Sequence, residues 1–186
     1  MSDGPHRSLP MRPKWKRVAE SADNAAFGAD EICNALVPAL EEDCRSEVSA
    51  EFLDGLRRFC TDQETLLFKK EALPALESLR DLSGSGMGRV VLEHAIQAAA
   101  TGSVGIDIAE KAVNHALRDR GARCARQVEE HYCRESSVPR ANQVRGRIEK
   151  AIGDADIAGI TRRVLNPGTG KATVEKRAGL EDGVKL

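Results

Sequence analysis

Apolar residues along this chain recur three and four positions apart, which is the spacing that places side chains on one face of an α-helix. The clearest example begins at Ser46, where Val48, Phe52, Leu56 and Cys60 form one such stripe. We find no convincing alternation of apolar and polar residues with a period of two, the pattern typical of a half-buried strand. The chain is therefore predicted to be all-α.

Glycine, proline and capping residues divide the pattern into helical segments. Pro38 is expected to kink or divide the first of them, because an interior proline removes a backbone donor. Glu47 is expected in the first turn of the second and Asp154 at the N-cap of the last. In chain order, we predict helices over 18–45, from Ser46 to Cys60, from a capping box at 61–64, over 74–82, 89–100 and 106–133, from about Pro139 to Gly153, and over 157–165.

The predicted fold is an irregular bundle of about six to eight amphipathic helices with disordered ends. Residues 1–13 are read as a disordered basic arm, 14–166 as a single helical domain and 167–186 as a disordered tail. Trp15 lies among basic residues, a combination that can grip nucleic acid or a membrane surface. We favour the simpler interpretation, in which Trp15 packs the start of the chain onto the domain.

The amino-acid composition indicates what kind of hydrophobic core the fold has and which cellular compartment the protein occupies. Aromatic residues make up only 3% of the chain and apolar residues 41%, so the core must rest on Leu, Val, Ile and Ala. Such a core favours closely packed helices. Five cysteines at irregular spacing, with no secretory signal at the start, indicate reduced thiols and a cytoplasmic protein. No apolar run is long enough for a membrane span, so no membrane partner is expected.

The net charge of −1 conceals an uneven distribution of charged residues. Residues 18–82 hold six basic and fifteen acidic groups, a balance of −9, whereas 118–165 hold eleven basic and seven acidic groups, a balance of +4. Such segregation is found in proteins that bind nucleic acid or acidic partners. It also arises when two parts of one fold, or two copies in a dimer, complement each other, and we favour this second interpretation.

Two patterns suggest ligand chemistry but lack the context that it requires. The spacing Gly84-x-Gly86-x-Gly88 precedes a helix and could bind phosphate, yet a dinucleotide-binding loop follows a strand, and here the preceding residues are predicted to be helical. We interpret it as an interhelical loop. Cys124 and His131 would share a helix face suited to zinc, but Cys133 would point away from them. No metal ligand, cofactor or catalytic residue is predicted.

The long helix over 106–133 is the first place to look for a protein partner. Val113, Leu117 and Val128 lie along its apolar seam and are the predicted anchors. The same stripe would equally serve as the protein's own core, and both interpretations remain open at this point.

Arginine is the most distinctive residue of the later part of the chain. Arg118, Arg126, Arg140 and Arg147 are the predicted anion-binding or nucleic-acid-binding residues, because the planar guanidinium matches phosphate. Arg140 and Arg147 are seven residues apart and share a helix face, whereas Arg118 and Arg126 are offset by about 80° at 100° per residue.

The leading hypothesis from sequence is a non-enzymatic helical protein–protein interaction module, an adaptor or regulatory subunit that binds a partner or itself. The alternative is a nucleic-acid-associated protein that uses the basic arm and the arginine-rich helices at 118–163. An enzyme is the third hypothesis, and it would require a pocket with converging titratable groups.

Overall fold

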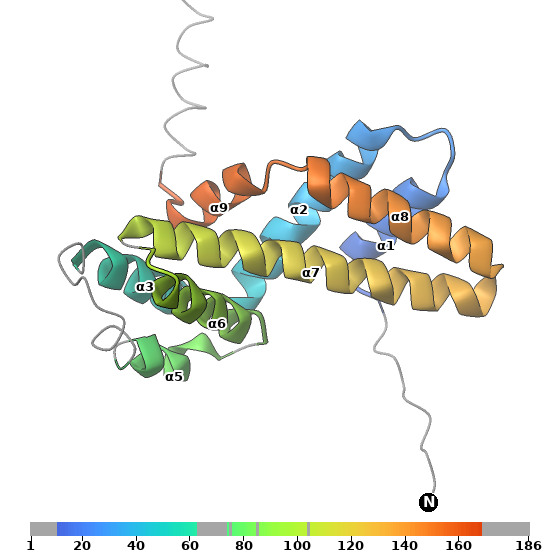
Figure 1. Ribbon diagram of the computed structural model, residues 1–186. Coiled ribbons are helices and arrows are strands. Elements are labelled where there is room, and N and C mark those ends of the chain that lie inside the picture. The colour runs from blue at the N-terminus through green and yellow to red at the C-terminus, as the bar shows by residue number, and fades with distance from the viewer. Residues whose placement is uncertain (1–10, 63–73, 75, 85, 104, 169–186) are drawn as a thin grey trace, which may run out of the picture.

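The computed structural model describes residues 11–62, 74, 76–84, 86–103 and 105–168, and these residues form helices and connecting turns (Figure 1). No β-strand occurs among them, so the all-α prediction is confirmed. The helices are α1 (Pro13–Asp23), α2 (Ala29–Glu47), α3 (Ala50–Asp62), α5 (Arg80–Ser83), α6 (Gly86–Ala100), α7 (Ile106–Glu135), α8 (Val138–Asp154) and α9 (Ile157–Leu165).

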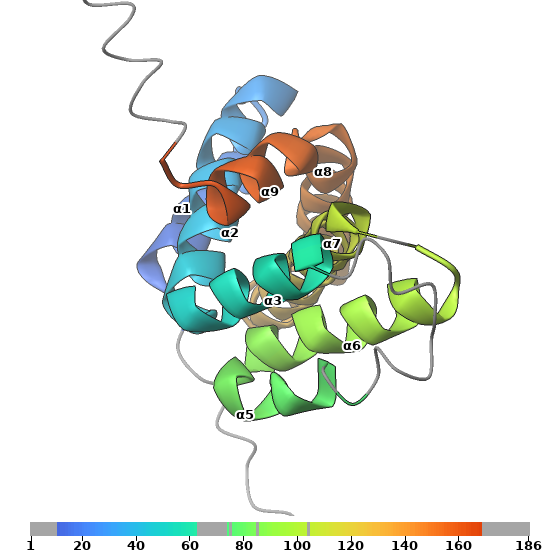
Figure 2. The same ribbon diagram turned by 90° about the vertical axis from the view of Figure 1, so that its left-hand side faces the viewer.

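Helix α7 is the longest element, with 30 residues, and it forms the axis of the bundle. Its first half packs against α6, and its second half runs beside α8, which returns antiparallel after a short break (Figure 1). Figure 2 looks roughly along α7 and shows α3, α6, α8 and α9 arranged around it. Helices α1 and α2 pack on each other and on α8. The predicted helices over 89–100 and 106–133 are thus confirmed to within a few residues at each end.

Small side chains allow these close helix contacts. Alanine supplies much of the buried seam of α7, at Ala109, Ala112, Ala116 and Ala125. Gly121 faces Ile152 of α8, and a β-carbon there would lie 2.8 Å from the Ile152 Cδ1 atom. Helix α7 is unbroken at this glycine, and α8 packs against it.

The first predicted helix is divided, but not at the residue that the sequence suggested. Pro38 lies inside α2 on its exposed side, where water can replace the lost backbone hydrogen bond. The break falls instead between Asn24 and Gly28. Asn24 starts a turn there, since its side-chain oxygen accepts a hydrogen bond from the Ala26 amide at 3.0 Å.

The boundary between α2 and α3 also differs from the prediction. Glu47 is the last residue of α2 and therefore does not occupy the first turn of the next helix. Helix α3 begins at Ala50, and the Ser49 hydroxyl accepts a hydrogen bond from the Phe52 amide at 3.1 Å. This is the local bond expected of an N-cap serine. Thr61 and Asp62 continue α3, and the rest of the predicted capping box lies outside the described residues.

The glycine-rich stretch was interpreted as an interhelical loop, and the structure bears this out only for Gly84, because Gly86 and Gly88 already belong to α6. Gly84 has a φ of 57°, in the left-handed region that glycine enters without strain, and it ends α5. A β-carbon on Gly88 would overlap the carbonyl oxygen of Ser83, whereas one on Gly86 would meet nothing. Gly88 therefore permits α6 to pack against the end of α5.

The last helix is capped two residues later than predicted. The Asp156 carboxylate, rather than that of Asp154, accepts a hydrogen bond from the Gly159 amide at 2.9 Å. The predicted disordered ends fall mostly outside the described residues, although Met11 and Arg12 are part of the fold. None of the helices in the described part of the chain is long and apolar enough to cross a membrane.

Candidate functional site

The most buried charged residue of the described chain is Asp43 on α2, whose side chain is 5% exposed. Three donors from two other helices and a helix cap converge on it. The Trp15 Nε1 and Arg120 Nε groups each donate at 2.8 Å, and an Arg12 guanidinium nitrogen donates at 3.1 Å. The carboxylate thus joins α1, α2 and α7.

Glu47 extends this network one helical turn further along α2. Its carboxylate oxygen lies 2.9 Å from guanidinium nitrogens of both Arg12 and Arg120. Two acids and two arginines therefore balance each other, and Trp15 completes the hydrogen bonding of Asp43. Buried charges whose hydrogen bonds are satisfied usually serve to stabilise the fold. We therefore infer that this network holds α1 against α2 and α7. The packing role expected for Trp15 is thereby confirmed.

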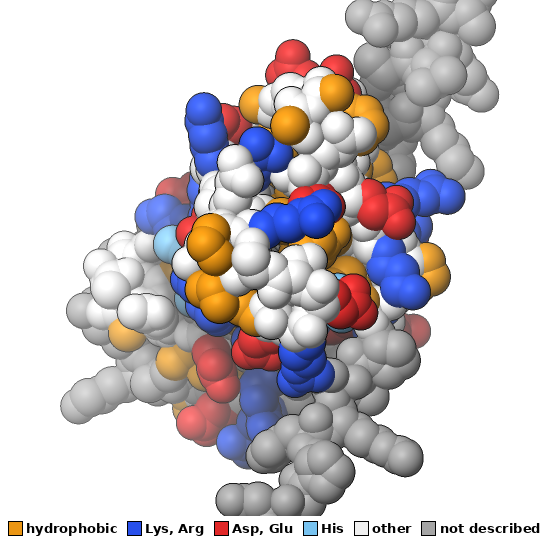
Figure 3. All heavy atoms as spheres, turned by 90° about the vertical axis from the view of Figure 1, so that its right-hand side faces the viewer, with side chains coloured by type: hydrophobic (Ala, Val, Ile, Leu, Met, Phe, Trp, Pro, Cys, Tyr) orange, Lys and Arg blue, Asp and Glu red, His pale blue; other side chains and the backbone are white. Residues whose placement is uncertain are grey.

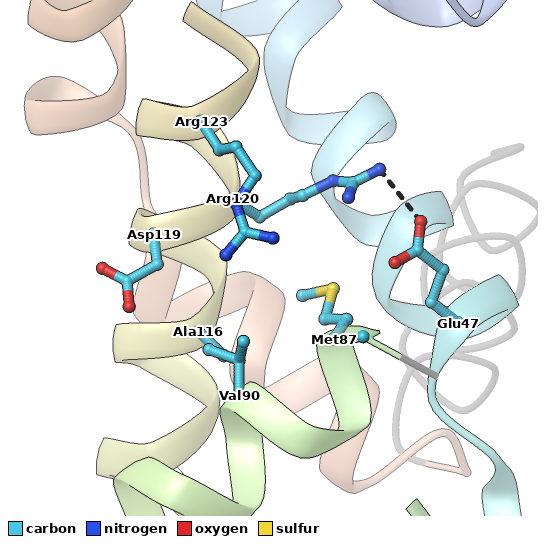
Figure 4. Close-up of a pocket in the computed structure, with 8 residues that line it drawn as sticks. Glu47, Met87, Val90, Ala116, Asp119, Arg120 and Arg123 are labelled. Atoms are coloured by element: carbon cyan, nitrogen blue, oxygen red, sulfur yellow. Dashed lines mark hydrogen bonds and ion pairs between the residues drawn. The ribbon is translucent and has the colours of Figure 1, made fainter. Parts of the chain in front are cut away.

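A small cavity lies beside this network, between α6 and α7 (Figure 4). Arg123 points into it, whereas Arg120 turns away toward Glu47 and Asp119 points out on the other side of α7. The cavity volume is about 40 Å³. A single water molecule needs at least about 10–15 Å³ of such volume, so the cavity has room for a few water molecules and no more.

A larger groove opens where the start of α3 meets the end of α9. It is half-open to solvent and has a volume of about 390 Å³. Most of its lining is apolar and comes from three helices and the turns beside them. The apolar lining residues are Val48, Ala50, Leu53, Val164, Leu165 and Pro167.

The charged residues that border this groove are Arg45 on α2, Asp54 and Arg57 on α3, and Arg163 on α9. Arg57 also donates to the Leu165 carbonyl oxygen at 3.5 Å, a contact that ties the end of α9 to α3. The groove walls are therefore held by the bundle itself. The groove combines an unfilled apolar surface with a predominantly positive border.

The structure places the three predicted partner anchors in the core. Val113 and Leu117 are 0% exposed and Val128 is 1% exposed. A partner could reach them only if the helices packed on α7 moved away from it, so we correct their assignment from partner anchors to core residues. This is the alternative that the sequence analysis left open.

Two of the four predicted anion-binding arginines brace α8 against α1. Arg140 forms a two-pronged ion pair with Asp23, at 2.7 and 2.5 Å, and Arg147 donates to the Ala22 carbonyl oxygen at 2.9 Å. The hydrogen bond from Arg140 lowers the pKa of Asp23 below its ordinary value. The shared face that the sequence predicted for Arg140 and Arg147 is thus directed to the end of α1.

Arg118 and Arg126 are exposed on α7 and are not drawn into these contacts. Figure 3 views the end of the molecule where α7 finishes and α8 begins, and basic and acidic side chains are interspersed on that face. Such mixing gives no single-sign field at this end of the arginine-rich helices. The structure does not bring the four predicted arginines together as one anionic-ligand site.

The residues that suggested a metal site do not form one, because Cys124 is buried and His131 pairs with a carboxylate on the surface. His131 lies 3.2 Å from Glu135. Within the part of the chain that the structure describes, no group of three or more His, Cys, Asp or Glu residues could hold a metal ion. Burial raises the pKa of both Cys44 and Cys124 to about 12 and that of Cys60 to about 11, so these thiols stay protonated at neutral pH.

Sequence reasoning missed the groove between α3 and α9 entirely. Its arginines come from three helices and are separated by up to 118 residues, so no local motif connects them. The apolar lining residues belong to ordinary helical stripes. Comparison with protein-family models, with curated proteins and with solved structures finds no match for this chain.

Proposed function

We propose that this protein is a non-enzymatic protein-binding module and that the α3–α9 groove receives a segment of another polypeptide. The observation that supports the proposal is the unfilled apolar groove of about 390 Å³. Apolar side chains that enter it would leave water, which contributes about 25 cal/mol per Å² of buried apolar surface. Pockets that receive one or two large apolar anchors are the usual centres of protein interfaces.

The position of the groove supports a binding role because helices form its walls. Val48, Val164 and Leu165 are themselves nearly buried, so the apolar floor continues into the core. A groove that is already formed costs little ordering entropy when a partner binds.

The chemistry of the groove gives less support to an enzyme. Its polar border consists of arginines and Asp54, and these residues pair with carboxylates or with each other. No cysteine, histidine, serine or threonine lines the groove among the described residues, so no nucleophile–base pair is present there.

A selection from a random library of 12-residue peptides tests the proposal. The library is displayed on phage, selected on immobilised full-length protein, and counter-selected on the variant Ala50→Trp. Ala50 is exposed and lines the groove, so a tryptophan at this position would fill it while leaving the core intact. Peptides rich in large apolar residues are expected, with affinity for Ala50→Trp lowered at least about tenfold, or about 1.4 kcal/mol.

Ala29→Trp is the matched control, because Ala29 is also the exposed first residue of a helix but does not line the groove. Selected peptides should bind this variant as they bind the wild type. Equal binding to the wild type and to Ala50→Trp would show that the groove is not the binding surface. The groove could instead be occupied by a second copy of the chain, and light scattering of the wild type and Ala50→Trp tests this alternative. A wild-type dimer that becomes monomeric in Ala50→Trp would identify a second copy as the occupant.

A further inference from the structure

The charges around the α3–α9 groove are arranged in two units, each with two arginines and one carboxylate. Glu41 is shared by Arg45, at 2.8 Å, and Arg163, at 3.3 Å. Glu41 lies on α2. On α3, Asp54 is shared by Arg57 and Arg58 of the same helix, at 2.7 and 2.9 Å. Among the described residues, Arg45 and Arg163 thus meet a single carboxylate, which leaves one positive charge in excess beside the apolar lining.

The arginines keep hydrogen-bonding capacity for a ligand. A guanidinium has five N–H donors, and a single shared carboxylate cannot engage the donors of two arginines. The side chains of Arg45 and Arg163 are 55% and 44% exposed, so their remaining donors face water. A ligand carboxylate could pair with either group without breaking its contact with Glu41.

From this arrangement we infer that the occupant of the groove is an acidic polypeptide segment, with Asp or Glu residues beside its apolar anchor. This inference rests on the proposed function and names the chemistry of the partner. Arg45, Arg57 and Arg163 come from three different helices around the apolar lining, so acids next to the anchor along the segment would find a guanidinium nearby. Charge complementarity of this kind sets specificity and association rate at interfaces.

The apolar lining favours a polypeptide over a nucleic acid as the anionic partner. Phosphates would also pair with arginine, but proteins that bind single strands stack the bases on aromatic side chains. None of the described residues that line the groove is aromatic.

Three synthetic peptides test the inference. All are labelled 12-residue peptides with two leucines four positions apart, and the flanking residues are glutamate, glutamine or lysine. Fluorescence anisotropy with the full-length protein at low salt should show the glutamate peptide binding about tenfold more tightly than the glutamine peptide, and the lysine peptide binding most weakly. The preference for glutamate over glutamine should shrink as salt rises.

The double variant Arg45→Gln/Arg163→Gln should lose most of the preference for glutamate, whereas its affinity for the glutamine peptide should be unchanged. Arg162→Gln is the matched control, since Arg162 is a neighbouring exposed arginine of α9 that does not line the groove. Equal affinity for the glutamate and glutamine peptides, or a single-stranded oligonucleotide that outcompetes the glutamate peptide, would overturn the inference but not the groove. If none of the three peptides binds and selection yields no peptide sensitive to Ala50→Trp, the proposed function fails as well.

Discussion

At the scale of single residues, Asp43 is the charge on which the attachment of α1 depends. Its carboxylate accepts hydrogen bonds from Trp15, Arg120 and Arg12, and water reaches it only slightly. Removal of one partner from a buried network leaves the others desolvated and unpaired. Asp43 therefore stabilises the fold far more than an exposed acid on the same helix.

We expect Asp43→Ala to lower the free energy of unfolding by about 3 kcal/mol, because the buried Trp15 Nε1 group would lose its acceptor and Arg120 would lose one of its two carboxylate partners. Chemical denaturation followed by circular dichroism measures this change. Glu42→Ala is the control, since Glu42 pairs with Lys14 on the surface and should contribute less than about 1 kcal/mol. Equal losses in the two variants would contradict the structural role of Asp43.

The buried thiols make stability depend on alkaline pH. Burial raises the pKa of Cys44 and Cys124 from 9.0 to about 12, so the folded state retains protons that the unfolded state releases above pH 9. Their contribution to stability is complete below pH 9 and is lost as pH rises toward 12. We expect the melting temperature to fall over this window, and the slope to be shallower in Cys44→Ala/Cys124→Ala.

Cys133 provides the control for this pH dependence because it is exposed. Cys133→Ser should keep the slope of the wild type between pH 9 and 11. It should also remove the rapid phase of the reaction of the native protein with a thiol reagent near pH 8. Three of the other four thiols are buried, and burial raises the pKa of the half-buried Cys33, which slows its reaction. A slope that is unchanged in Cys44→Ala/Cys124→Ala would show that the buried thiols do not set it.

At the scale of elements, the turn between α5 and α6 shows that neighbouring glycines serve different purposes. Gly88→Ala should destabilise the protein by about 2 kcal/mol, because the new methyl group would overlap the Ser83 carbonyl. Gly86→Ala is the matched variant in the same turn of α6. It should be neutral or stabilising by up to about 1 kcal/mol, since open space surrounds Gly86 and alanine favours the helix.

Thermal denaturation of both variants beside the wild type measures this difference. If Gly86→Ala were the more damaging substitution, the packing of α6 on α5 would differ from that described. Gly84 lies outside this comparison because its positive φ penalises any side chain regardless of space.

The helices themselves were largely predictable because apolar periodicity is a local property. Apolar periodicity predicted helices over 89–100, 106–133 and 157–165, and the structure places α6, α7 and α9 there. The boundaries were less predictable wherever tertiary contacts decided them. Pro38 is tolerated because it faces solvent. Glu47 ends α2 because the backbone becomes extended at Val48, and its carboxylate pairs there with two arginines from elsewhere in the chain.

At the scale of the whole molecule, the candidate groove could not have been read from the sequence. Arg45 and Arg163 share Glu41 only because α9 returns to α2 after more than a hundred residues. The same principle explains why the predicted anchors changed role. A stripe such as Val113 and Leu117 has one composition whether it faces a partner or the core. Only the packing of the other helices on α7 distinguishes the two.

The fold likewise determines what each arginine of the segment 118–163 contacts. Arg120 belongs to the buried network, Arg140 and Arg147 hold α1, and Arg163 borders the groove. The arginines of this segment therefore lie in three separate places and have different structural roles. Neither net charge nor local arginine content therefore identifies a binding surface in this chain.

Hydrogen exchange of the full-length protein, with and without the tightest selected peptide, tests the central claim most directly. The account predicts that the peptide slows amide exchange around 50–57 and 163–167, the two segments that face each other across the groove. The exposed end of α7 near Arg134 should exchange at the same rate in both samples. Protection at α7 and α8 with no change around 50–57 and 163–167 would place the binding surface elsewhere and contradict the account.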